Sequence, residues 1–189
     1  SIVQVSLALM LLPGRIIKAH FCTQTVGEAS CDAFAAALRA ADKNNVKMVL
    51  ESLTTLIRLT SSAYWAPRLA QNGVFQALCD GLDDEKASGT VLAAQLVTLC
   101  RVIMVDPSAF YQCVKHIAST KGLSETRQLE TTLDAMWRSF DYVGVSYDRK
   151  LIALAFANLL TLVRIRFVAW PYRPKAHASD CFAGQSTNI

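Results

Sequence analysis

Apolar residues recur along three stretches of the chain at spacings that place them on one face of a helix. In residues 44–62 they fall at i, i+4, i+7 and i+11, at Val46, Leu50, Leu53 and Ile57. Residues 124–143 repeat that spacing at Leu129, Leu133, Met136 and Phe140, so we expect Phe140 to be buried between helices. Residues 88–105 carry a wider apolar face, which we expect neighbouring helices to cover on both flanks. The pattern therefore predicts long amphipathic helices.

Glycine, proline and cap residues mark the ends of these helices. Asn44 and Asn45 offer a cap to the first stretch, and Ser124 offers one to the second. Proline is tolerated in a first helical turn, so Pro67 and Pro107 predict helix starts. With the breaks near residues 27 and 146, the predicted unit starts fall about 40 residues apart, which is the length of a HEAT or armadillo repeat.

This spacing predicts an all-α fold, specifically an α-solenoid of roughly four HEAT/armadillo-like helix pairs. The alternative is a compact helical bundle whose even spacing is accidental, because no residue signature repeats between the units. Shape separates the two: a solenoid keeps its contacts between neighbouring units, whereas a bundle brings its first and last helices together.

The same pattern divides the chain into three parts. Residues 1–26 are expected to form a truncated helix and a linker, because the apolar opening has no initiator Met, positive leader or cleavage site. Residues 27–164 hold the repeats. Residues 165–189 are expected to form an irregular tail, since Pro171 and Pro174 exclude a helix interior.

Composition and charge exclude several classes of protein. Hydrophobic residues make up 52% of the chain and charged residues 18%, which argues against intrinsic disorder. The net charge is +4, and most of it comes from the basic residues after Val163, so the body lacks the basic face that nucleic-acid binding needs. The apolar run 151–163 is shorter than the roughly 20 residues of a membrane span. We therefore predict no nucleic acid and no membrane span.

Candidate catalytic and metal-binding residues are few. Cys113 and His116 could share one helix face as half of a zinc site, but a second pair of ligands is missing. The three histidines lie in no recognisable nucleophile motif, and the chain has no Gly-rich phosphate loop or dinucleotide fingerprint. The sequence predicts no enzyme activity and no cofactor. Cysteines without a Cys-x-x-Cys pair fit a reducing compartment.

Two short segments are candidates for contact with a partner protein. Asp83, Asp84 and Glu85 form the only acidic run and would attract a basic segment, although a solvated turn is the common alternative. Tyr64 and Trp65 could anchor a partner, whereas aromatic residues at a helix junction usually fill the gap between repeats.

The segment from Met136 to Phe156 resembles a repeat near the C-terminal end of importin-β superfamily (karyopherin) nuclear transport receptors. In that family a helix ending in an aromatic and an acidic residue is followed by a short loop, and then by an Arg-Lys pair that opens an Ala/Leu-rich helix. The matching residues here are Phe140, Asp141, Arg149, Lys150, Leu151, Ala153, Leu154 and Ala155. The second helix is apolar almost all round, so we expect other helices to enclose it.

The resemblance implies a non-catalytic solenoid that binds protein cargo, located in the nucleus and cytoplasm. It also implies that Ran GTPase would bind through an N-terminal part of the parent protein. Arg149 and Lys150 are candidates for cargo contact, and the alternative is a structural ion pair that closes the loop. Because cations are unfavourable at a helix start, we expect Asp141 or Asp148 nearby. A generic HEAT or armadillo scaffold is the main alternative, and a helical enzyme is a third.

Overall fold

The computed structural model describes residues 24–41 and 45–167, and throughout this part of the chain every regular element is a helix. The prediction of an all-α fold is confirmed. The elements are α3 (Gln24–Ala40), α4 (Val46–Leu59), α5 (Ser62–Gln71), α6 (Val74–Leu82), α7 (Gly89–Val105), α8 (Pro107–Lys121), α9 (Glu125–Arg138), the 3-10 helix η1 (Ser139–Tyr142) and α10 (Ser146–Phe167).

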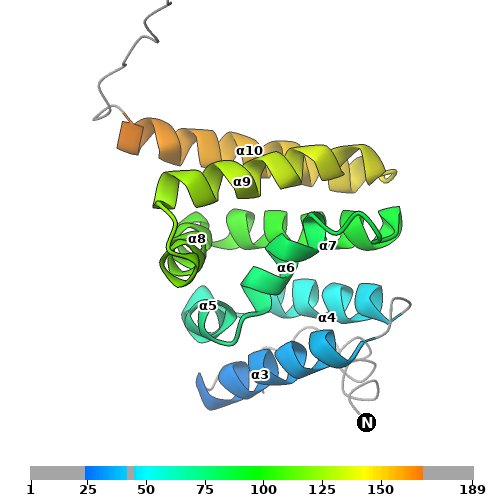
Figure 1. The fold of residues 1–189 in the computed structure, drawn as a ribbon. Coiled ribbons are helices and arrows are strands. Elements are labelled where there is room, and N and C mark those ends of the chain that lie inside the picture. The colour runs from blue at the N-terminus through cyan, green and yellow to red at the C-terminus, as the bar shows by residue number, and fades with distance from the viewer. Residues whose placement is uncertain (1–23, 42–44, 168–189) are drawn as a thin grey trace, which may run out of the picture.

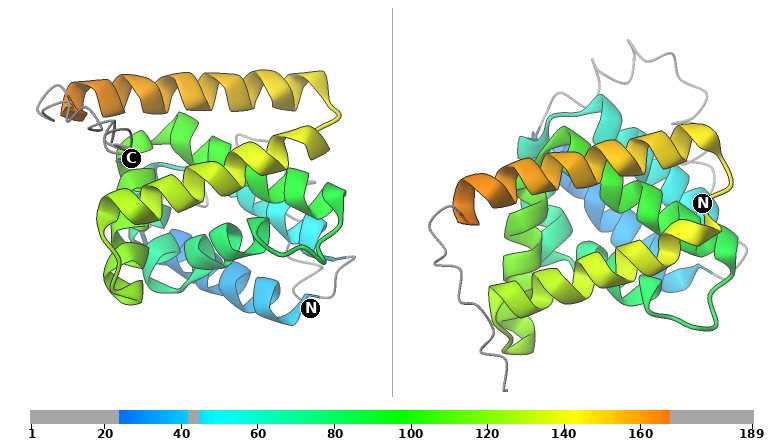
Figure 2. Two further views of the ribbon diagram at one scale, coloured as in Figure 1. Left: turned by 45° about the horizontal axis from the view of Figure 1, so that its top comes forward. Right: turned by 90° about the horizontal axis from the view of Figure 1, so that it is seen from above.

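Equivalent helices stack on one another in layers (Figure 1). In one layer α4 packs on α7 and α7 packs on α10, in a second α5 packs on α8, and in a third α6 packs on α9. Helices α5 and α8 run across α4, α7 and α10 (Figure 1), and the view from above shows α8 crossing the direction of α10 (Figure 2). The groups α5–α6–α7 and α8–α9–α10 are therefore two equivalent three-helix units, which is the armadillo form of the repeat.

The ends of the described stack are far apart in the fold. Helix α3 lies at one end and α10 at the other (Figure 1), and the strong packing contacts join neighbouring units. This arrangement is that of a solenoid rather than of a closed bundle. Helix α3 begins slightly before the predicted repeat region 27–164, and α10 ends slightly after it. The predicted opening segment before Gln24 and the predicted tail after Phe167 lie outside the described residues.

The predicted unit starts are only partly correct. Pro107 is the first residue of α8, as expected, but Pro67 lies inside α5, which begins at Ser62. Trp65 and Leu69 are both fully buried on either side of this proline, so tertiary packing holds the helix together despite the missing backbone donor. The break near residue 146 opens α10, the third helix of a unit rather than a new pair.

Two of the helices are capped as their sequences require. Asp106 precedes α8, and its carboxylate accepts a hydrogen bond from the Ala109 backbone N–H at 2.9 Å. Gly122 ends α8 with a φ of 66°, a left-handed conformation that favours glycine. Ser124 caps α9 as predicted, its hydroxyl accepting from Arg127 N–H. Asn45 occupies the cap position of α4 but makes no side-chain cap bond, and Asn44 lies outside the described residues.

One continuous apolar core joins the units. Phe75 of α6 and Phe110 of α8 are fully buried, and their rings meet edge to face with centroids 5.5 Å apart. The predicted stripe of α4 is largely confirmed, because Leu50, Leu53 and Ile57 are fully buried.

The buried face of α9 differs from the predicted stripe. Its fully covered residues are Gln128, Thr132, Ala135 and Met136, followed by Ser139 of η1, whereas Leu129, Leu133 and Phe140 are only half-buried. The hydroxyls of Thr132 and Ser139 donate to backbone carbonyls four residues earlier, so burying them leaves no hydrogen bond unmade. Phe140 also lies in the 3-10 helix, where the α-helical period has ended. The prediction that Phe140 is buried between repeats is therefore wrong.

Helix α10 is not enclosed within the described part of the chain. Leu151, Ile152 and Ala155 are buried on its packed side, but Leu154 is 58% exposed and Leu160 is 68% exposed. The expectation that other helices surround α10 is wrong for these residues, because α10 is the last helix of the described stack and packs mainly on α7.

Candidate protein-binding surfaces

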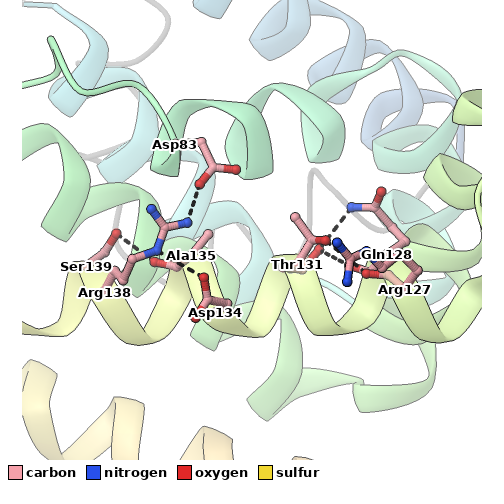
Figure 3. Close-up of polar contacts among 9 residues, drawn as sticks. Asp83, Arg127, Gln128, Thr131, Asp134, Ala135, Arg138 and Ser139 are labelled. Atoms are coloured by element: carbon pink, nitrogen blue, oxygen red, sulfur yellow. Dashed lines mark hydrogen bonds and ion pairs between the residues drawn. The ribbon is translucent and has the colours of Figure 1, made fainter.

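The acidic turn after α6 is tied to α9 by an ion pair. The Arg138 guanidinium lies 2.7 Å from one carboxylate oxygen of Asp83 and 3.1 Å from one of Asp134 (Figure 3). Hydrogen bonding to Asp83 raises the pKa of Arg138, and Asp134 contributes in the same direction. Asp83 therefore has an internal partner, which reduces its availability to another protein.

The other two acidic residues of the turn differ from Asp83. Asp84 accepts a hydrogen bond from the Lys86 backbone N–H at 2.9 Å, which shapes the turn and leaves its carboxylate exposed. Glu85 is exposed as well. Neither carboxylate has an ion pair among the residues that the structure describes. The carboxylates of Asp84 and Glu85 are the part of the predicted acidic site that faces solvent.

Arg149 and Lys150 lie in the first turn of α10 but have different surroundings. Arg149 Nε donates to the Val143 carbonyl at 2.6 Å, and its guanidinium lies 5.6 Å from the centroid of the Phe140 ring. Its partners are thus a carbonyl and a ring, where a carboxylate of Asp141 or Asp148 was expected. Lys150 is exposed and forms no ion pair with a described residue.

The other candidate residues are distributed between core and surface. Trp65 is fully buried and Tyr64 half-buried, so the tryptophan fills the space between units. Cys113 is buried whereas His116 is exposed, and burial, followed by the nearby Asp106, raises the pKa of the Cys113 thiol to about 12. A neutral thiol is a poor metal ligand. Among residues 24–41 and 45–167 no His, Cys, Asp and Glu side chains gather in a group able to hold a metal ion.

Aromatic side chains are exposed where α9 meets α10. The Trp137 side chain is 67% exposed, yet its ring stacks on Phe140 and meets the edge of Phe156, with both centroid distances 6.1 Å. Tyr142 and Tyr147 are 55% and 64% exposed. None of the described helices has the length and hydropathy that a membrane span requires.

The comparison with known families identifies the kind of protein. The family model described as "Importin-11-like, TPR repeats" matches residues 9–169, a range that holds every described helix and the whole segment from Met136 to Phe156. The chain belongs to this importin-11-like family. No curated protein and no solved structure matches the chain. The resemblance to the importin-β superfamily predicted from residues 136–156 is confirmed, and the family consists of transport receptors of a non-catalytic kind.

One cluster on this importin-like repeat region was missed by the sequence analysis. Arg58 of α4, Arg101 of α7 and Tyr147 of α10 come from the three helices of one layer. A hydrogen bond from Arg101 lowers the pKa of the Tyr147 phenol, and Arg58 adds a smaller effect of the same sign. The three residues are widely separated in the sequence and belong to no motif, so only the packing of α4, α7 and α10 brings them together.

Proposed function

We propose that the chain is a protein-binding part of a nuclear transport receptor, acting in the nucleus and cytoplasm by binding protein cargo. The observation that carries this proposal is the family match over residues 9–169. The stacked units support it, because a solenoid offers a long surface to partners while contacts between neighbouring units maintain the fold. Ran GTPase binds, in this proposal, through an N-terminal part of the parent protein.

The exposed charged residues assigned to cargo contact are Asp84 and Glu85 in the acidic turn and Lys150 at the start of α10. Asp83 and Arg149 act indirectly, because their internal partners hold the turn and the loop before α10 in place. A basic cargo segment that contacts the acidic turn binds less tightly as salt rises, since salt screens exposed charges over about 8–10 Å.

The test is a pull-down from nuclear and cytosolic extract with the full chain, read beside a titration with Ran–GTP. The proposal predicts captured cargo proteins together with weak or absent Ran–GTP binding. The double variant D84N/E85Q should capture less basic cargo, while Glu130→Gln, which removes an exposed carboxylate from α9, should not. Tight Ran–GTP binding would contradict the proposal, and recovery of only membrane-coat or phosphatase subunits would favour the generic scaffold.

A further inference from the structure

Two arginines lie on neighbouring helices of the layer formed by α4, α7 and α10. Arg101 is the only charged residue in the whole of α7. Arg58 is exposed near the end of α4, and Arg101 is half-buried near the end of α7. The two helices are fixed side by side, with a hydrogen bond of 2.9 Å between the Thr54 and Thr98 hydroxyls. Both guanidinium groups are therefore held on neighbouring helices.

Neither arginine is neutralised by a carboxylate within the part of the chain that the structure describes. The five basic side chains in described ion pairs are others, namely Lys47, Lys115, Lys121, Arg127 and Arg138. The Nε atom of Arg101 is also buried without a hydrogen-bond acceptor. Because Arg101 as a whole is only half-buried, a partner carboxylate that reaches the accessible part of its guanidinium would form a strong, charge-assisted hydrogen bond.

Tyr147 adds an aromatic surface to the two charges. Tyr147 is 64% exposed, and it lies close enough to Arg101 for this guanidinium to lower the pKa of its phenol. Asp148, which follows Tyr147 on α10, acts on the phenol in the opposite sense to the two arginines, and the acidic residue of α4, Glu51, pairs with Lys47 at 3.7 Å. The combination of two arginines with an exposed tyrosine is typical of the residues that dominate protein interfaces.

We propose that Arg58, Arg101 and Tyr147 form a binding site for an acidic segment of a partner protein, in which Asp or Glu carboxylates accept hydrogen bonds from the two guanidinium groups. The partner's backbone or an apolar side chain packs on the Tyr147 ring. This inference rests on the proposed function, since it assigns one chemical class of cargo segment to one face of the receptor.

The first test uses a short acetylated peptide of glutamates and aspartates as the probe, with its glutamine and asparagine counterpart as the uncharged control. Arginine Nε–H signals in NMR spectra report on the two guanidinium groups directly. We expect the acidic peptide to shift the Arg101 and Arg58 signals and the uncharged peptide to leave them unchanged. Each of Arg58→Gln and Arg101→Gln should weaken binding about 10-fold, the factor expected when one charge-assisted hydrogen bond is lost.

Matched variants separate a binding role from a structural one. Arg127→Gln removes an exposed guanidinium from α9 and should leave the affinity for the acidic peptide unchanged. Arg101→Lys keeps the positive charge and should bind the peptide more tightly than Arg101→Gln does. Tyr147→Phe keeps the ring and should weaken binding less than Arg101→Gln. Circular dichroism melting checks that every variant is folded. Equal affinity for the acidic and the uncharged peptide, or an affinity indifferent to R58Q/R101Q, would overturn the proposal, as would tighter binding of a single-stranded RNA oligonucleotide than of the acidic peptide.

Failure of this inference can be told from failure of the proposed function. If the R58Q/R101Q variant still captures all the cargo of the unaltered chain and the acidic peptide does not bind, the inference is wrong and the receptor role stands. If the acidic peptide binds but no cargo is captured from either extract, the receptor role is wrong and the site stands.

Discussion

At the scale of single residues, the start of α8 shows how much one side chain contributes. Asp106 satisfies one of the backbone N–H groups that a helix start leaves without a partner, and Pro107 follows it in a position that needs no donor. Replacing Asp106 with Ala should lower the free energy of unfolding by about 0.5–2 kcal/mol. Urea denaturation measures this change. Ser61→Ala is the control, because Ser61 precedes α5 without a side-chain cap bond and should have little effect.

The buried thiols make a second prediction at this scale. Burial raises the pKa of Cys79 and of Cys113 to about 12, with Asp80 adding at Cys79 and Asp106 at Cys113, although a hydrogen bond with Thr132 opposes the rise at Cys79. A pKa raised by folding means that the folded state holds its protons more tightly than the unfolded state. The stabilising effect is complete below the unfolded pKa of about 8.5 and is lost as pH rises toward 12.

The measurement compares thiol labelling with stability. At pH 8 the native protein should react slowly at its buried cysteines and rapidly after unfolding, in a background in which Cys22 and Cys181 are replaced by Ser. The free energy of unfolding should then fall between pH 9 and about 11, and less steeply in a Cys79→Ala variant. Rapid labelling of the native protein would show that these thiols are accessible, contrary to their burial. The buried cysteines that this measurement probes are Cys31, Cys79, Cys100 and Cys113.

At the scale of the helices, two phenylalanines should respond differently to truncation. Phe110→Ala removes a fully buried ring that meets Phe75 and should cost about 3–5 kcal/mol. Phe140→Ala removes a half-buried ring between Trp137 and Arg149 and should cost only about 1–2 kcal/mol. The denaturant midpoints of the two variants measure these two losses of stability. Equal losses would mean that Phe140 is as deeply buried as the hydrophobic spacing predicts.

The successes and failures of the helix predictions have a physical explanation. Apolar spacing predicted that α4, α7 and α9 are helices, and it also predicted the buried face of α4, because a buried stripe of large side chains leaves a strong helical period. It misplaced the face of α9, since the period counts apolar residues and ignores Thr132 and Ser139, which become buried by donating to their own helix. It also placed a helix start at Pro67, where the buried Trp65 and Leu69 outweigh the local rule.

At the scale of the whole molecule, repeat length and helix pattern were sufficient to predict an all-α solenoid. They did not predict that each unit has three helices, because only Asn72 and Gly73 separate α5 from α6 and this break was not recognised in the apolar pattern. The cluster of Arg58, Arg101 and Tyr147 was also beyond the sequence. Its members meet only through the lateral packing of α4, α7 and α10, and that register is a property of the stack.

The central claim is that units stack in one direction and that contacts stay between neighbours. Spin-label distances test it most directly, in the Cys22→Ser and Cys181→Ser background, with labels at exposed positions. Val105 and Ala157 mark α7 and α10, which pack together at a helix spacing of about 8–10 Å, and Ala36 marks α3 at the other end of the stack. The account predicts a short distance for the Val105–Ala157 pair and a much longer, single distance for Ala36–Ala157. Equally short distances for both pairs would mean a closed bundle and would contradict it.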